Sequence, residues 1–129
     1  MGLRNVLGEE LQECGNDPMT GFTRSGRCEV TVEDVGVHGV CAVMTTEFLA
    51  HQQELGNDLV TPMPQWHFPG LRPGDRWCVV AVRWLQSARD GRAAPVVLAS
   101  THESVLQVVP LELLHRYAVD VPDDPSTLL

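Results

Sequence analysis

The chain has 129 residues, of which 43% are apolar and 20% are charged, and its formal net charge is −8. This composition is typical of a globular protein rather than a disordered one, and the length predicts a single domain over residues 1–129. The acidic balance argues against nucleic acid and anionic membranes as partners, because both attract clustered positive charge.

All nine basic residues are arginines. The absence of lysine excludes Schiff-base catalysis and a P-loop lysine. No apolar segment is long enough to span a bilayer, and the N-terminal residues lack the apolar stretch of a signal peptide. We therefore expect a cytoplasmic protein.

Turn-forming residues dominate residues 1–23, which predict a turn-rich lead-in. A β-branched apolar run then predicts a strand over residues 35–44. The next segment predicts a helix over residues 46–55, because Thr45 can cap its start and Gly56 can end it.

Residues 57–74 contain four prolines and no helical or strand periodicity. Loops of this length are usually functional or disordered. Trp66 and Phe68 would be costly to leave in water, so we expect an ordered, packed loop.

Apolar residues at helical spacing predict a second helix over residues 76–90. Residues 95–101 and 105–109 predict the two strands of a hairpin, and Pro110 begins a short final helix. The tail over 119–129 is predicted to be frayed. Together these elements predict an α+β fold: a small mixed or antiparallel sheet with a C-terminal hairpin, two main packing helices and a long ordered Pro-rich loop.

Several blocks of the sequence carry a family resemblance. They include C-x-x-D-P-x-T-G-F at 14–22, E-D-V-G-x-H-x-V-C-A-V-M-T at 33–45, and F-P-G-L-x-P-G-D-R-W-C at 68–78. With these blocks the chain resembles, from Asn5 to Tyr117, a bacterial family known as domain of unknown function 2237. The resemblance implies a small bacterial protein and names no reaction. The chain has Arg27-Cys28 where relatives often have paired cysteines, which weakens any scheme that needs a vicinal pair.

Two histidines are the first candidates for catalysis. His38 follows the acidic pair Glu33-Asp34, and His102 precedes Glu103. A carboxylate near a histidine orients the ring and raises its basicity. The alternative is that each ring is a buried histidine satisfied by backbone groups.

The four cysteines allow more than one interpretation. Cys41 is a further catalytic candidate and Cys14 a ligand-binding one, whereas Cys78 fits a buried core position. Because a cytoplasmic location is reducing, we expect four free thiols, with Cys14 or Cys28 the most reactive.

The spacing His38-x-x-Cys41 is typical of metal ligands, and Cys14 and Cys28 can complete a tetrahedral set. However, a strand points residues three apart to opposite faces. No C-x-x-C or H-E-x-x-H motif is present. We therefore expect no metal and no cofactor, and keep Cys14, Cys28, His38 and Cys41 as the set to consider if a metal is bound.

Ligand-binding candidates lie on the second predicted helix and on the long loop. Arg83 lies between Trp77 and Trp84, which suggests a cation stacked on rings or presented to an anion; a surface arginine with a buried stem is the alternative. Asp58 and Trp66 belong to the loop.

Three classes of function remain open. The first is a small-molecule-binding protein or small enzyme, in which His38, Arg83 and His102 converge beneath loop 57–74 with Trp66 or Phe68 as a lid. The second is a protein-interaction module that uses this loop as its contact surface. The third is a structural domain stabilised by a metal or by cysteine oxidation. We favour the first, although the sequence assigns no nucleophile, base and orienting group that would predict an enzyme.

Overall fold

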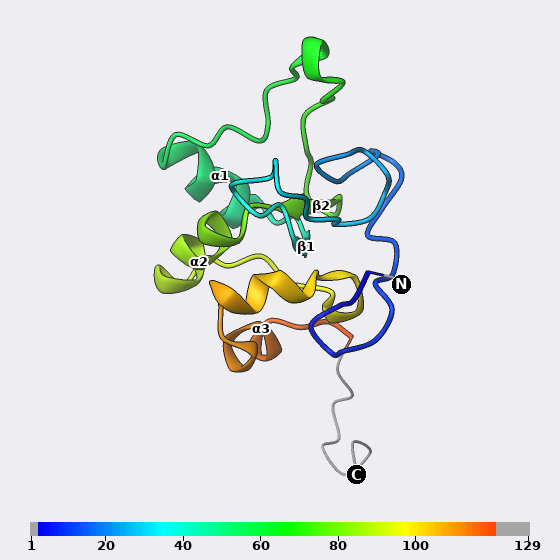
Figure 1. Ribbon diagram of the computed structural model, residues 1–129. Helices are drawn as coiled ribbons and strands as arrows, with labels where there is room; N and C mark the ends of the chain where they lie inside the picture. Colours follow the sequence, from blue (N-terminus) through cyan, green and yellow to red (C-terminus); the bar gives the residue numbers. More distant parts are fainter. Residues whose placement is uncertain (1–2, 121–129) are drawn as a thin grey trace.

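The computed structural model describes residues 3–120 and has an α+β architecture, as the sequence predicts (Figure 1). Its regular elements are β1 (Val40–Val43), α1 (Thr46–Glu54), β2 (Arg76–Val79), α2 (Ala81–Arg89) and α3 (Leu111–Arg116). In Figure 1, α1 and α2 lie beside the strand pair, and the chain between α1 and β2 rises away from the body of the molecule. No helix among residues 3–120 has the length and apolar character that crossing a bilayer requires.

The two strands pair antiparallel, and the two faces of the pair differ in chemistry. Cys41 lies opposite Cys78, and Ala42 lies opposite Trp77. Because side chains alternate along a strand, Ala42 and Trp77 point into the main apolar core, together with Val40 and Val79. The cysteines point to the other face, where they form a separate buried cluster with Val97.

All four cysteines are paired, so the expectation of free thiols is wrong. One disulfide joins Cys14 to Cys41 and the other joins Cys28 to Cys78. All four residues are buried. The expected reactivity of Cys14 and Cys28 assumed exposed loop positions, whereas the fold places both against the strand pair.

Strand β1 is shorter than predicted because the residues before it form a tight turn. The Val37 amide donates to the Asp34 carbonyl (3.1 Å), and Val37 has a φ of 58°, which strand geometry does not allow. The predicted strand over 35–44 therefore begins only at Val40. Helix α1, by contrast, is confirmed, and the Thr45 hydroxyl accepts the Phe48 amide at 3.1 Å.

The predicted helix over 76–90 is wrong in its first four residues, which form β2. Trp77, Cys78 and Val79 are all buried, because one face of β2 meets the main core and the other meets the cysteine cluster. Helix α2 begins only at Ala81. Aromatic and β-branched residues favour strands, but pairing with the distant β1 decides the outcome.

The predicted C-terminal hairpin is also wrong. Residue 96 makes only isolated bridges, one to Ala42 and one to Ala118, and 3-10 turns follow at Leu98–Ser100 and Glu103–Gln107. In the second turn the His102 ring accepts the Ser104 amide (3.0 Å) and caps the turn. Val105 and Val109 are buried, a spacing that fits either a helical turn or one face of a strand, so periodicity alone could not decide.

The predicted tail begins with two ordered residues. The Val119 amide donates to the Val96 carbonyl (2.9 Å), and the Asp120 carboxylate accepts the Leu98 and Ala99 amides at 2.8 and 2.9 Å. Fraying is therefore wrong for 119–120, and the rest of the predicted tail, 121–129, lies outside the described residues.

Trp84 provides a test of the core. Its ring is fully buried on α2, its Nε1–H donates to the Ala94 carbonyl (2.9 Å), and its ring meets Tyr117 edge to face. We predict that Trp84→Ala lowers the free energy of unfolding by about 3–5 kcal/mol, measured by urea denaturation. Trp66→Ala is the matched control because Trp66 is 67% exposed. Equal stability losses in the two variants would contradict this core.

Candidate ligand pocket

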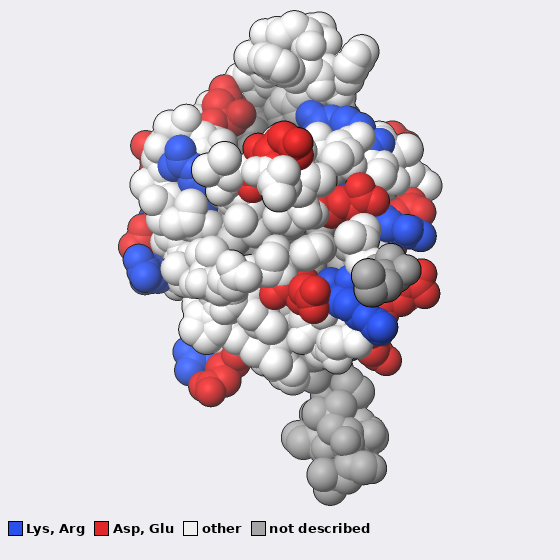
Figure 2. Space-filling view, in the orientation of Figure 1, with Lys and Arg blue, Asp and Glu red and all other residues white. Residues whose placement is uncertain are grey.

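A cavity of about 470 Å³ lies beneath loop 57–74. Figure 2 shows the surface hollowed below the lobe that this loop forms, with basic side chains scattered among acidic ones on the same face. The volume falls within the range typical of small-molecule sites. Its walls come from the turn at 21–24, from residue 38, from the loop, and from β2.

Aromatic rings form much of the wall. Phe68 and Trp77 meet edge to face with ring centroids 5.2 Å apart. Phe68 is held by a two-way backbone pairing with Met63, with N···O distances of 2.8 and 3.2 Å. Trp66, on the 3-10 turn Pro64–Trp66, and Phe22 complete the aromatic lining. Such walls favour a flat, apolar ligand surface.

Arg24 supplies the positive charge of the pocket. Its guanidinium stacks over the Trp77 ring (4.9 Å to the centroid) and donates to the Gly21 carbonyl (2.7 Å) and the Trp66 carbonyl (3.4 Å). Its Nε is buried and has no hydrogen-bond partner among the described residues. Burial lowers the pKa of Arg24 from its ordinary value, but a guanidinium stays charged at neutral pH. A guanidinium has five N–H groups, and Nη1 and Nη2 each make one hydrogen bond here, so Arg24 retains donors for an anionic group.

His38 is held by a buried carboxylate. One oxygen of Asp34 lies 2.6 Å from His38 Nδ1, and the other accepts the His38 backbone amide at 2.8 Å. The Asp34 side chain is fully buried, whereas the His38 side chain is 35% exposed and lines the cavity. In the neutral tautomer in which Nδ1 donates to Asp34, Nε2 is the acceptor. The pair has the arrangement of an oriented general base.

Asp58 lies at the rim. Its carboxylate accepts the Val60 and Thr61 amides (2.9 and 3.0 Å) and the Thr61 hydroxyl (2.6 Å). The Thr61 hydroxyl is the main reason that the pKa of Asp58 is lowered, followed by the two backbone amides. Its contacts therefore shape the start of loop 57–74.

The structure brings together only some of the residues that the sequence singled out. His38, Asp58 and Trp66 line the cavity, whereas Arg83 and His102 do not. Arg83 instead donates to the Leu55 carbonyl at 3.4 Å. The expected convergence of His38, Arg83 and His102 is therefore not observed.

The two remaining candidates, Cys14 and Cys41, are joined to each other in the buried cluster. The set kept in case a metal is bound is not the one that the structure brings together. The possible ligand atoms that lie close together belong to Cys14, Cys28 and Cys78, and His38 is not among them. Cys78 is the fourth cysteine of the buried cluster.

Sequence reasoning missed Arg24, but it placed a carboxylate from Glu33 or Asp34 beside His38, and the structure shows that the partner is Asp34. The local signal was the acidic pair just before the histidine, in a segment that contains turn-forming residues. Arg24 had no comparable signal, since its role depends on Trp77, which is distant in sequence.

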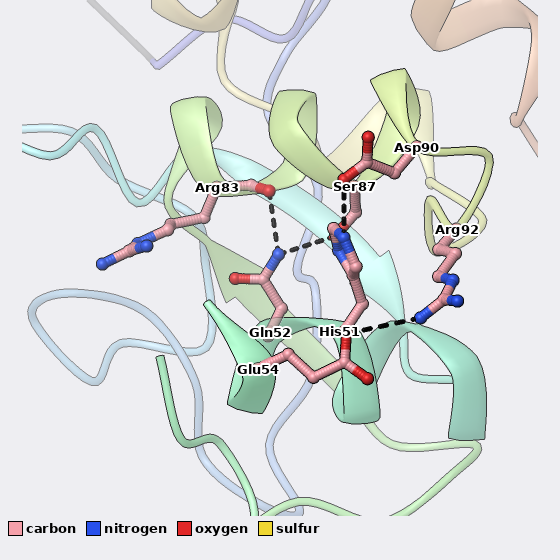
Figure 3. A network of polar contacts seen from close by, with 7 residues as sticks. All are labelled: His51, Gln52, Glu54, Arg83, Ser87, Asp90 and Arg92. Atoms are coloured by element: carbon pink, nitrogen blue, oxygen red, sulfur yellow. Dashed lines mark hydrogen bonds and ion pairs between the residues drawn. The ribbon is translucent and has the colours of Figure 1, made fainter. Parts of the chain in front are cut away.

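A second polar network resembles a hydrolase triad but joins two helices (Figure 3). His51 Nδ1 lies 2.8 Å from the Ser87 hydroxyl, and His51 Nε2 lies 2.8 Å from the Asp90 carboxylate. Gln52 also donates to Ser87 Oγ at 2.7 Å. Ser87 is fully buried, Asp90 is exposed, and neither lines the cavity. This network therefore holds α1 against α2.

A known protein family covers nearly the whole of the chain. The model of DUF2237, a family of uncharacterized proteins conserved in bacteria, matches residues 4–118. The chain belongs to this family. The match spans the cysteine cluster and the whole cavity, so both lie within the DUF2237 domain. No curated protein matches the chain.

The polar network between α1 and α2 predicts that its loss lowers the free energy of unfolding and leaves the cavity unchanged. Ser87→Ala leaves the buried His51 Nδ1 and Gln52 Nε2 each without one partner, and an unsatisfied buried group costs about 1–3 kcal/mol. We expect this variant to lower the free energy of unfolding by about that amount in urea denaturation. A stability within error of the parent would contradict a structural role.

The burial of His102 predicts that the stability of the protein depends on pH. Burial lowers the pKa of His102 below its ordinary value of 6.5, outweighing the opposing charges of Glu103 and Glu29. The unfolded chain therefore binds this proton more tightly, so the contribution of His102 to stability is complete above about pH 6.5 and is lost as the pH falls below it.

When the pH is lowered from about 8 to about 5, we expect the free energy of unfolding to fall less in His102→Asn than in the parent. The reason is that asparagine retains a capping oxygen but does not titrate. Urea denaturation at both pH values measures the difference. The same loss in both proteins would contradict the assignment.

Proposed function

We propose that this protein binds a small, flat organic anion in the cavity beneath loop 57–74. The observation that carries the proposal is the coexistence of three features in one cavity: aromatic walls, the guanidinium of Arg24, and the His38 ring oriented by Asp34. Rings bind the apolar faces of a ligand, and a guanidinium favours a carboxylate, sulfonate or phosphate at one end.

His38 gives the proposed site a polar end with a fixed direction. Because Asp34 holds Nδ1, the ring presents an acceptor nitrogen that can bind a ligand hydroxyl or amine, or remove a proton from it. Proton transfer is the chemistry that this pair supports. Among the described residues, the one cysteine that lines the cavity is Cys78, and it is bound to Cys28, so the proposal includes no thiol nucleophile.

The proposed partner is a small molecule and not a nucleic acid or membrane. A net charge of −8 disfavours polyanionic surfaces. A single small anion is different, because its contact with Arg24 is local and partly buried, so the attraction between the two charges is screened less than it would be in bulk solvent.

A protein partner is the second candidate, and the exposure of the loop favours it. Trp66 is 67% exposed, and Val60 and Met63 are also exposed on the same lobe. Aromatic side chains are enriched at the centres of protein interfaces. This alternative needs Trp66 but does not need Arg24 or His38.

Two matched fluorescent probes test the proposal. 1-Anilinonaphthalene-8-sulfonate is an aromatic anion, and N-phenyl-1-naphthylamine has the same rings without the sulfonate. We expect both to bind the native chain. Arg24→Gln should weaken binding of the sulfonate about tenfold or more, since a hydrogen bond to a charged group contributes about 1.5–3 kcal/mol. It should change binding of the neutral probe much less.

Arg83→Gln is the control, because Arg83 is an arginine outside the cavity. It should leave the affinity for both probes unchanged. Equal affinities of the two arginine variants for the sulfonate would reject the proposal. If only Trp66→Ala weakened both probes, the exposed lobe would be the better candidate.

A further inference from the structure

The four cysteines converge on one point from four separate segments. Cys41 and Cys78 lie directly opposite each other on β1 and β2, with their side chains on the same face. Their amides donate outward to Thr101 Oγ1 (3.2 Å) and Thr20 Oγ1 (2.8 Å), so they form the non-hydrogen-bonded type of pair. In this type the side chains of the two residues are closest.

The other two cysteines form a second preformed pair. Cys14 and Cys28 flank a loop whose neck is closed by backbone bonds from the amides of Cys14 and Gly15 to the Gly26 carbonyl, at 2.7 and 3.2 Å. Each pair is thus arranged by backbone contacts that do not require a sulfur–sulfur bond.

The sulfur positions approach those of a metal site. The Sγ atoms of Cys14, Cys28 and Cys78 lie within 4.8 Å of one another, although they belong to two different disulfides. Cys41 Sγ is bonded to Cys14 Sγ. A tetrahedral zinc ion with Zn–S distances of about 2.3 Å places its sulfurs about 3.8 Å apart. Once the two S–S bonds are broken, side-chain rotation lets the bonded sulfurs move apart toward this spacing, and lets Cys41 Sγ, which lies outside the group of three, turn toward the other sulfurs.

We propose that these four cysteines form a single zinc site when they are reduced, and that the two disulfides are the oxidised, metal-free form of the same site. The ligands are the thiolates of Cys14, Cys28, Cys41 and Cys78. This set differs from the one that the sequence suggested, because Cys78 replaces His38.

The interconversion balances with a dithiol as reductant. Each disulfide accepts two electrons and two protons from one dithiol, which itself becomes a disulfide, so two dithiols yield four cysteine thiols. Zinc then binds as the four thiols release four protons to solvent. In the reverse direction, two disulfide-class oxidants each take up two electrons from the thiolates and two protons from solvent, the two cysteine disulfides form, and the ion leaves.

The surroundings favour a closed structural site over a catalytic one. All four cysteines are buried, and their apolar neighbours are Val97 and the half-buried Val43. A site with four sulfur ligands leaves no open position for water or substrate. Zn²⁺ also neutralises half of the charge that four buried thiolates would carry, which lowers the cost of burying them.

Cobalt binding by the full chain tests the proposal. The protein is reduced with a phosphine under nitrogen and titrated with Co²⁺, which in a tetrahedral thiolate site gives intense visible ligand-field bands and near-ultraviolet charge-transfer bands. We expect one Co²⁺ per chain, displacement by one Zn²⁺, and protection of all four thiols from alkylation in the zinc-loaded chain. The air-oxidised chain should bind neither ion.

Two variants locate the ligands. Cys28→Ser should weaken Co²⁺ binding at least tenfold or alter its spectrum, whereas His38→Gln should match the parent. A reduced parent chain that forms no one-to-one cobalt complex overturns the proposal, whether or not that chain is folded. Loss of the cobalt bands in His38→Gln also overturns it, because the site would then be a mixed cysteine–histidine one.

Discussion

The pairing of β1 with β2 is the constraint on which the rest of the structure depends. The register places Ala42 and Trp77 on the face that meets the main core, and Cys41 and Cys78 on the other face. An isolated two-stranded ribbon is marginally stable in water. Here both faces are buried: one against apolar side chains, the other against the loop that carries Cys14 and Cys28.

The same strand contributes to both candidate sites. In β2, Trp77 forms a wall of the cavity and stacks under Arg24, while the adjacent Cys78 holds Cys28. The turn that supplies Phe22 and Arg24 lies within the loop between Cys14 and Cys28. Because these cysteines fasten the loop to the strand pair, we expect their reduction to loosen one wall of the cavity.

Local signals predicted what depends on neighbours in sequence. Thr45 could be identified as the cap of α1, and the α+β class followed from the mixture of patterns. The other elements depend on contacts between residues that are distant in sequence. Residues 76–79 were predicted as helix because Trp77 fits helical spacing, but they form β2 by pairing with β1. The disulfide pairing could not be predicted either, because four cysteines allow three pairings and the sequence alone does not favour one of them. Arg24 became a site residue only through the distant Trp77.

Native-state hydrogen exchange at two matched amides tests most directly whether the cysteines fasten the loop. The Cys78 amide donates to Thr20 inside the loop, and the Cys41 amide donates to Thr101 outside it. Both are buried and lie opposite each other in the strand pair. On reduction without metal, exchange at Cys78 should accelerate much more than exchange at Cys41. Equal changes at the two amides, or no change at either, would contradict the account.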